Sequence, residues 1–228
     1  MVASEEIDDA YCPVDEEDKI RQAYYIGGDA SFELRVQWGY SRCNTFANIH
    51  CRPDIPKEFT IHGLWRDNGY NQGPPLVNTV FETRKINKKL QEKMKKCWPS
   101  MDLRNGEVND TYFWSHEWVR HGQYTGWSQG CYFAEAVNLF EKQEITGVIL
   151  RRFPPGPTQT LSVRDLERGV HAEKNIIVFV KCNTNKDDEQ QLQEIGIYYL
   201  YKGGKWSAID HPKQSECDSN IPMVFPYE

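Results

Sequence analysis

The chain has 228 residues and a formal net charge of −6, and aromatic residues make up 13% of it. A chain of this length can bury one sizeable core, and its aromatic content excludes a disordered protein. The acidic charge gives no overall attraction for a polyanion, so local groups must bind any nucleic acid. No run of about 18 apolar residues occurs, which excludes a transmembrane helix.

Residues 1–30 are acidic and end in a glycine pair, so they predict an N-terminal extension followed by a single domain at 31–228. The first residues also lack the apolar stretch of a secretory signal. Either the protein is cytosolic or an original signal has been replaced by a new initiator Met.

Alternating apolar residues predict two strands near the start of the domain. In SFELRVQW, residues 31–38, every second side chain is apolar, which is typical of a strand with one buried face. In EFTIHGLW, residues 58–65, the alternation stops at Gly63, so we expect His62 at the end of a short strand.

Helical patterns occupy the middle of the chain. An amphipathic segment at 83–98 ends before Pro99. Further helices are expected at 112–122, 132–143 and 162–170, the last capped by Ser162.

The C-terminal part is rich in β-branched and aromatic residues. The runs NIIVFVKC, EIGIYYLY and KWSAID are separated by polar or glycine-rich turns, which indicates antiparallel strands. Strands first, helices in the middle and strands last predict an α+β fold, with a central antiparallel sheet and several packed helices.

The stretch FWSHEWVRHGQY, residues 113–124, concentrates two histidines, a glutamate and an arginine on the second predicted helix. At about 100° per residue, all four fall on one helix face, with Trp118 and Val119 free to contact the core. A zinc helix needs histidines four apart, whereas His116 and His121 are five apart and about 140° round the helix. An ordinary charged helix face with i,i+4 pairs is the other interpretation.

A second stretch, FTIHGLWRDN at 59–68, offers another histidine beside Trp65, Asp67 and an amide. Alone it could be a strand-end histidine with a core tryptophan. Two histidines from separate elements can act as acid and base, and a neighbouring cation can stabilise a phosphoryl group in transfer. An exposed tryptophan suits stacking on an RNA base. Together the stretches favour an RNA-cleaving site that needs no metal or cofactor.

These two segments resemble the two active-site signatures of the ribonuclease T2 family, which read like FTIHGLWPDN and FWEHEWxKHGTC. VQWGYSRC looks like that family's early strand, and VKC…SEC looks like its C-terminal cysteine pair. The resemblance extends from about Phe32 to the C-terminus. It implies a ribonuclease T2-like fold and endonucleolytic cleavage of single-stranded RNA through a 2′,3′-cyclic phosphate, without a metal.

The resemblance also implies a role for each matching residue. His121 would be the base that takes the ribose 2′-OH proton, and His62 the acid that protonates the leaving oxygen. His116 would hold the phosphate, while Glu117 and Arg120 would stabilise the pentacovalent transition state. The positions that match the family's base-binding residues are Trp65, Asp67 and, less securely aligned, Tyr70.

Three departures from the family pattern stand out. Arg120 replaces a lysine, which keeps the charge but changes its reach. Arg66 replaces the proline of HGLWPDN. HGQY replaces HGTC, and the loop after the first signature also lacks a cysteine, as loss of one disulfide would require.

The seven cysteines contain no C-x-x-C pair, which favours disulfides over a zinc site, although free thiols remain the alternative. Given the resemblance, we expect Cys43–Cys51 and Cys182–Cys217, with Cys97–Cys131 possible and Cys12 left over. The family further implies an extracellular or vacuolar monomer, whereas the missing signal suggests the cytoplasm. A ribonuclease-like storage or recognition protein with little or no turnover is the alternative function.

Overall fold

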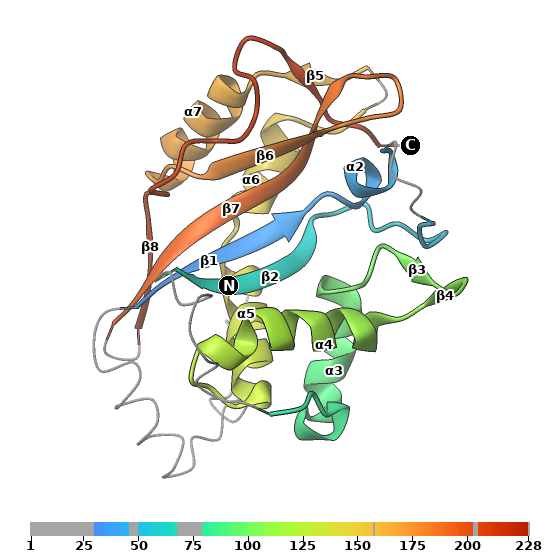
Figure 1. Ribbon diagram of the computed structural model, residues 1–228. Helices are drawn as coiled ribbons and strands as arrows, with labels where there is room; N and C mark the ends of the chain where they lie inside the picture. The colour runs from blue at the N-terminus through green and yellow to red at the C-terminus, as the bar shows by residue number, and fades with distance from the viewer. Residues whose placement is uncertain (1–29, 46–49, 68–78, 157, 203–204, 228) are drawn as a thin grey trace, which may run out of the picture.

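A twisted sheet forms the centre of the molecule (Figure 1). The structure, a computed structural model, describes residues 30–45, 50–67, 79–156, 158–202 and 205–227. Within them the sheet has seven strands in the order β2-β1-β7-β9-β5, with β6 and β8 also paired to β7. Its strands are β1 (Ala30–Gln37), β2 (Thr60–Asp67), β5 (Thr160–Leu161), β6 (Phe179–Thr184), β7 (Gln190–Lys202), β8 (Lys205–Ile209) and β9 (Met223–Val224).

All pairings in this sheet are antiparallel except the single parallel bridge between β7 and β9. The predicted α+β class with a central antiparallel sheet is therefore confirmed. A separate two-stranded hairpin joins β3 (Leu103–Arg104) to β4 (Glu107–Val108).

The α-helices pack around this sheet (Figure 1). They are α2 (Gly39–Cys43), α3 (Lys88–Cys97), α4 (Asp110–Arg120), α5 (Gln129–Lys142), α6 (Ile145–Arg152) and α7 (Val163–Lys174). Three predicted helices correspond to α4, α5 and α7, and the Ser162 hydroxyl accepts a hydrogen bond from the Asp165 amide as a cap. The helix expected at 83–98 begins late, because Asn87 caps α3 after a 3-10 turn at Thr83–Lys85. The short helices α2 and α6 were not predicted.

One face of the sheet carries the main hydrophobic core. Phe32, Leu34 and Val36 of β1 are fully buried on this face. Helix α5 covers it, and the Tyr132 hydroxyl donates to the Leu64 carbonyl of β2. Each large apolar side chain removed from water in this way contributes about 1.5–3 kcal/mol.

The opposite face of β1 is also buried, so the expectation of one buried face is wrong. Glu33, Arg35 and Gln37 point to this second face and each is only 5% exposed. A strand can bury charged side chains only if they find partners, because an unpaired buried charge costs several kcal/mol. The partners lie on β7 and in the chain after β8, as described below.

A β-bulge in β2 determines where His62 points. Arg35 pairs with Gly63 and Val36 pairs with Ile61, which leaves His62 without a partner opposite it. A bulge bends the strand and redirects the extra residue's side chain. The strand then continues to Asp67. The expectation that Gly63 ends the strand is therefore wrong, because Gly63 continues the ladder on the far side of the bulge.

Two disulfides join the described cysteines in the expected pairs, Cys43–Cys51 and Cys182–Cys217. Cys97 is a free thiol whereas Cys131 is disulfide-bonded, so the Cys97–Cys131 pair considered above does not form. Burial raises the pKa of the Cys97 thiol to about 12. In the part of the chain that the structure describes, no helix is long and apolar enough to cross a membrane.

Candidate active site

Helix α4 carries the second motif along the edge of the sheet beside β2 (Figure 1). Asn109 caps its first turn by accepting a hydrogen bond from the Tyr112 amide. The helix buries Trp114, Glu117 and Trp118 and leaves His116 exposed. The polar residues therefore do not share one exposed face.

Two further residues of this motif differ from the sequence expectation. Val119, expected in the core, is 48% exposed, because the buried side of α4 runs through Trp114 and Trp118 instead. His121 lies beyond the last helical residue as the C-cap, with φ −134° and ψ −49°. Its direction therefore follows the turn after the helix rather than the helical repeat.

Glu117 reaches the second face of the sheet at Gly63. Its Oε2 accepts a hydrogen bond of 3.2 Å from Trp65 Nε1, and its Oε1 lies 4.0 Å from His62 Nε2. A side chain at Gly63 would collide with this carboxylate, so glycine is what permits the approach. Burial raises the pKa of Glu117 to about 7, although the His62 charge and the Trp65 bond oppose the rise.

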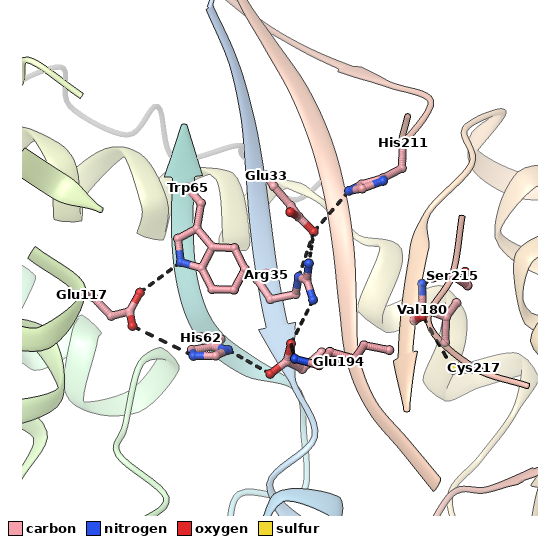
Figure 2. A network of polar contacts seen from close by, with 11 residues as sticks. Glu33, Arg35, His62, Trp65, Glu117, Val180, Glu194, His211, Ser215 and Cys217 are labelled. Atoms are coloured by element: carbon pink, nitrogen blue, oxygen red, sulfur yellow. Dashed lines mark hydrogen bonds and ion pairs between the residues drawn. The ribbon is translucent and has the colours of Figure 1, made fainter. Parts of the chain in front are cut away.

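His62 lies between two carboxylates (Figure 2). Its Nδ1 is 2.9 Å from Glu194 Oε1, and its Nε2 faces Glu117. Burial lowers the pKa of His62, but the hydrogen bond with Glu194 and the charges of Glu194 and Glu117 outweigh it, so the net shift is upward.

A row of buried charges continues from Glu194 across the sheet (Figure 2). Arg35 donates through Nη1 to Glu194 Oε2 at 3.0 Å and through Nε to Glu33 Oε1 at 2.8 Å. His211 Nε2 lies 3.2 Å from the same Glu33 oxygen. Sequence reasoning missed this row. The available signal was the pair of opposite charges, Glu33 and Arg35, that alternates with the apolar residues of this strand.

His121 and Trp65 pack against each other. Their ring centroids are 4.9 Å apart with an interplanar angle of 27°, and the Arg35 guanidinium lies 4.9 Å from the same Trp65 ring. Burial, together with the nearby cations His62, His116 and Arg120, lowers the pKa of His121 to about 3. Trp65 is thus half-buried and already in contact with protein groups, not the fully exposed platform that the sequence suggested.

Two adjacent cavities open onto His62. One, of about 410 Å³, is lined by His116, Glu117 and Tyr112 among others. The second, of about 240 Å³, includes Gln37, Lys181 and Glu194, and both share His62 and Phe113. Such a space can hold a nucleotide-sized group beside His62. His121 is not among the residues that line either cavity.

The remaining predicted residues lie at the edges of the site. The Asp67 carboxylate accepts a hydrogen bond from the Tyr198 hydroxyl of β7. Arg120 is exposed at the end of α4, and Tyr70 lies outside the described residues. Within the described ranges, no cluster of three His, Cys, Asp or Glu side chains has a geometry that could hold a metal ion.

The fold and the site therefore define an α+β protein in which His62, His116 and the buried Glu117 line a cavity, while His121 packs against Trp65 outside its lining. The protein-family model described as the ribonuclease T2 family matches residues 30–217. The chain belongs to the ribonuclease T2 family.

Individual relatives agree with this assignment. Ribonuclease S-2 of Antirrhinum hispanicum is 29% identical over 85% of this chain and 80% of its own length. Ribonuclease MC of Momordica charantia is 32% identical over 68% of this chain and 80% of its own. The crystal structure of an RNase MC1 variant in complex with 5′-GMP superimposes with a TM-score of 0.70 at 25% identity, covering 86% of this chain and all of that one.

The family and these relatives make the chain a T2-type endoribonuclease, as the resemblance implied. The division into an extension at 1–30 and a domain at 31–228 stays a prediction, although the family match begins at residue 30. The catalytic and base-binding roles of individual residues likewise stay predictions.

Proposed function

We propose that this protein cleaves single-stranded RNA by acid–base transphosphorylation, with His62 as the general acid and His121 as the general base. The observation that carries this assignment is the opposite shift of the two imidazoles. When the surroundings shift the pKa values of two titratable groups in opposite directions, the group with the raised pKa is suited to act as the acid and the other as the base. The pKa of His62 is raised, which keeps its proton available, whereas the pKa of His121 is lowered to about 3, which keeps its nitrogen free to accept one.

In the proposed reaction, His121 removes the proton from the ribose 2′-OH, and the 2′-oxygen attacks the adjacent phosphorus. His62 gives a proton to the departing 5′-oxygen as the P–O5′ bond breaks. The products are a 2′,3′-cyclic phosphate and a free 5′-hydroxyl. No metal or cofactor takes part in these steps.

The remaining polar residues around the cavity would stabilise the reacting phosphate. His116 lines the larger cavity with Glu117 and is suited to contact a phosphate oxygen. Arg120 carries a permanent charge at the end of the same helix, where it could approach a phosphate from solvent. Trp65, Asp67 and Tyr70 remain the proposed base-binding residues.

The decisive experiment is incubation of the purified protein with single-stranded RNA in EDTA across pH 4 to 8, with chromatography for cyclic phosphates. We expect cyclic-phosphate products without added metal. The His62→Ala and His121→Ala variants should each lose about 10²–10⁴-fold in kcat, because each removes one proton-transfer group.

A matched control is His171→Ala, which removes an exposed imidazole on α7 and should leave the rate unchanged. Equal cleavage by wild type and His121→Ala would refute the base assignment. Absence of products from the wild type at every pH would instead favour the storage or recognition function.

The partner and the compartment are also proposals. We propose single-stranded RNA as the only macromolecular partner, and a monomer in an extracellular or vacuolar compartment. The disulfides Cys43–Cys51 and Cys182–Cys217 support an oxidising compartment, since glutathione keeps most cytosolic thiols reduced. Mass measurement of the protein isolated from its source, before and after reduction, would test this location.

A further inference from the structure

We propose that Glu194 is a positioning residue for His62, and that Arg35 holds the Glu194 carboxylate in the orientation that this task requires. The proposal rests on the proposed role of His62 as the general acid. It concerns two buried charged side chains to which the acid–base scheme assigns no other role.

The hydrogen-bond pattern determines which nitrogen of His62 delivers the proton. Glu194 Oε1 lies 2.9 Å from Nδ1, and a carboxylate can only accept, so Nδ1 must carry hydrogen in this bond. The second proton of the imidazolium is then on Nε2, the atom that faces Glu117 4.0 Å away. Glu194 therefore directs the transferable proton away from the sheet and toward Glu117 (Figure 2). Glu117 lines the larger cavity together with His62.

Glu194 is itself held from behind. Its second oxygen accepts from Arg35 Nη1 at 3.0 Å, and the other edge of the same guanidinium binds Glu33. A planar guanidinium that binds two carboxylates at once has little freedom to rotate. His211 completes the row, because its Nδ1 accepts from the Lys213 amide and its Nε2 faces Glu33.

The backbone of the sheet leaves room for this row. Arg35 is paired with Gly63 on one side and with Gly196 on the other, so neither neighbouring residue places a side chain beside the guanidinium. A β-carbon at Gly196 would collide with the Glu33 carboxylate, and one at Gly63 would collide with Glu117. The two glycines flank the arginine in adjacent strands, which makes the buried row sterically possible.

Charged groups surround His62 from four elements and from the turn after α4. Glu194 comes from β7, Arg35 from β1 and Lys181 from β6, where Lys181 Nζ lies 3.7 Å from Glu194 Oε2. Glu117 and His116 come from α4, and His121 follows it.

Among the described residues, Glu194 is the one group of this set that hydrogen-bonds to the His62 ring. Against the effect of burial, His62 and the nearby cations hold the pKa of Glu194 at about 2, so its charge is present throughout the working pH range. It is therefore the group expected to keep His62 protonated as the pH rises.

The test is Glu194→Gln, because the amide oxygen can still accept from Nδ1 while the charge is lost. We expect NMR titration to show the His62 imidazole losing its proton at lower pH than in the wild type. The alkaline limb of the kcat/KM profile should move to lower pH by the same amount. Above that limb, kcat/KM should fall about tenfold for each pH unit. Near pH 4, where His62 is protonated in the variant as well as in the wild type, kcat/KM should change little.

Two further variants separate positioning from a merely structural role. Glu194→Asp restores the charge, and we expect it to return the alkaline limb most of the way to its wild-type position. Glu135→Gln makes the same change at a half-buried carboxylate on α5 that accepts from Trp206 Nε1. It should leave both the titration and the rate profile unchanged.

An unchanged His62 titration in folded Glu194→Gln would overturn the proposal, as would a loss of activity that is equal at every pH. If that variant does not fold, the wild type alone decides: the Nδ1 proton of His62 should give a protected downfield resonance, and an unprotonated Nδ1 would overturn the proposal. These spectra do not depend on turnover, so they distinguish failure here from failure of the proposed function, which the His62→Ala rate reports.

Discussion

At the scale of single residues, the sign of the neighbouring charges, rather than the depth of burial, makes the pKa values of His62 and His121 differ. Burial lowers the pKa of both imidazoles. His62 has carboxylates as its neighbours, which reverse the effect, whereas His121 has cations, which add to it. Trp65 contacts both rings and so keeps two imidazoles of different protonation within one small site.

The environment of Glu117 also determines how its carboxyl group can interact with a phosphate. With a pKa of about 7, this carboxyl is neutral in acid and becomes an anion above neutrality. A neutral carboxyl can donate a hydrogen bond to a phosphate oxygen, whereas the carboxylate repels it. RNA cleavage should therefore be favoured on the acidic side of pH 7.

The Glu117 shift also predicts a pH-dependent stability change. Because the folded pKa lies above the ordinary value of 4.5, the contribution of Glu117 is complete below pH 4.5 and is lost as the pH rises through about 7. Glu117→Gln should therefore unfold with a free energy larger than the wild type by on the order of 3 kcal/mol above pH 7, and by little in acid. Urea unfolding at both pH values measures this difference.

The exposed Glu173→Gln serves as the comparison variant, with no large difference expected at either pH. A stability gap for Glu117→Gln that is the same in acid and in base would mean that the carboxyl does not titrate as described.

At the scale of elements, the bulge in β2 and the end of α4 bring the two motifs together. The bulge redirects His62, and Gly63 beside it admits the Glu117 carboxylate. Gln123 Nε2, beyond the helix, and Trp118 Nε1, in its last turn, both donate to the Thr79 carbonyl, at 3.0 and 2.9 Å. Gln123, one of the departures from the family motif, thus secures the chain near the place where the family has a disulfide.

Two further departures, Arg66 and Tyr124, contact each other. Arg66 Nη1 donates to the Tyr124 carbonyl at 3.3 Å, which connects the end of β2 to the turn after α4. The arginine that replaces a proline therefore has a structural use between the two motifs, where it adds one hydrogen bond of about 1 kcal/mol.

The element-scale prediction concerns Gly63. In Gly63→Ala the new methyl group would collide with Glu117 and with the Trp65 indole nitrogen, so the helix or the indole must move. We expect a loss of about 1–3 kcal/mol in the free energy of unfolding and a fall in kcat, because Glu117 leaves its position beside His62.

Thermal unfolding and the RNA assay, run on the same samples, measure the effects of Gly63→Ala. Gly147→Ala provides the control, since its methyl group meets its nearest neighbour at an ordinary 3.4 Å on α6. Should the two variants behave alike, close packing at Gly63 would not be the cause.

At the scale of the whole molecule, the two disulfides that join described cysteines differ in how much chain they close. Cys43–Cys51 spans 8 positions near the end of β1, whereas Cys182–Cys217 spans 35 and ties β6 to the C-terminal segment. The net charge of −6 adds no attraction for RNA, so the cations near the site must provide it.

The whole-molecule prediction compares these two disulfides. Loop-closure entropy assigns about 4 kcal/mol to Cys182–Cys217 and about 2.5 kcal/mol to Cys43–Cys51. Replacing both cysteines of the longer pair by serine should therefore destabilise the protein more than the same change in the shorter pair. Guanidinium unfolding of the two double variants ranks them, and the reverse order would contradict the chain-entropy explanation.

Sequence patterns predicted the elements that local periodicity specifies. The helices α4, α5 and α7 and the strands β1, β6 and β7 were expected near their observed positions, and the two motifs identified His62, Glu117 and His121. The patterns were less informative where the direction of a side chain departs from the repeat expected for its strand or helix. The bulge at His62, the inward turn of Glu117 and the exposed Val119 depend on packing between elements.

The sequence by itself determined the α+β class, the family motifs and the kinds of side chain available for acid–base chemistry, because these depend on composition and on spacing over a few residues. Only the tertiary structure decided that β1 is buried on both faces and that Glu194 binds His62 from 132 positions away. The physical reason is the register of the sheet. Antiparallel pairing of β1 with β7 places Gln37 opposite Glu194 and brings Arg35 within reach of it, and no local pattern encodes that contact.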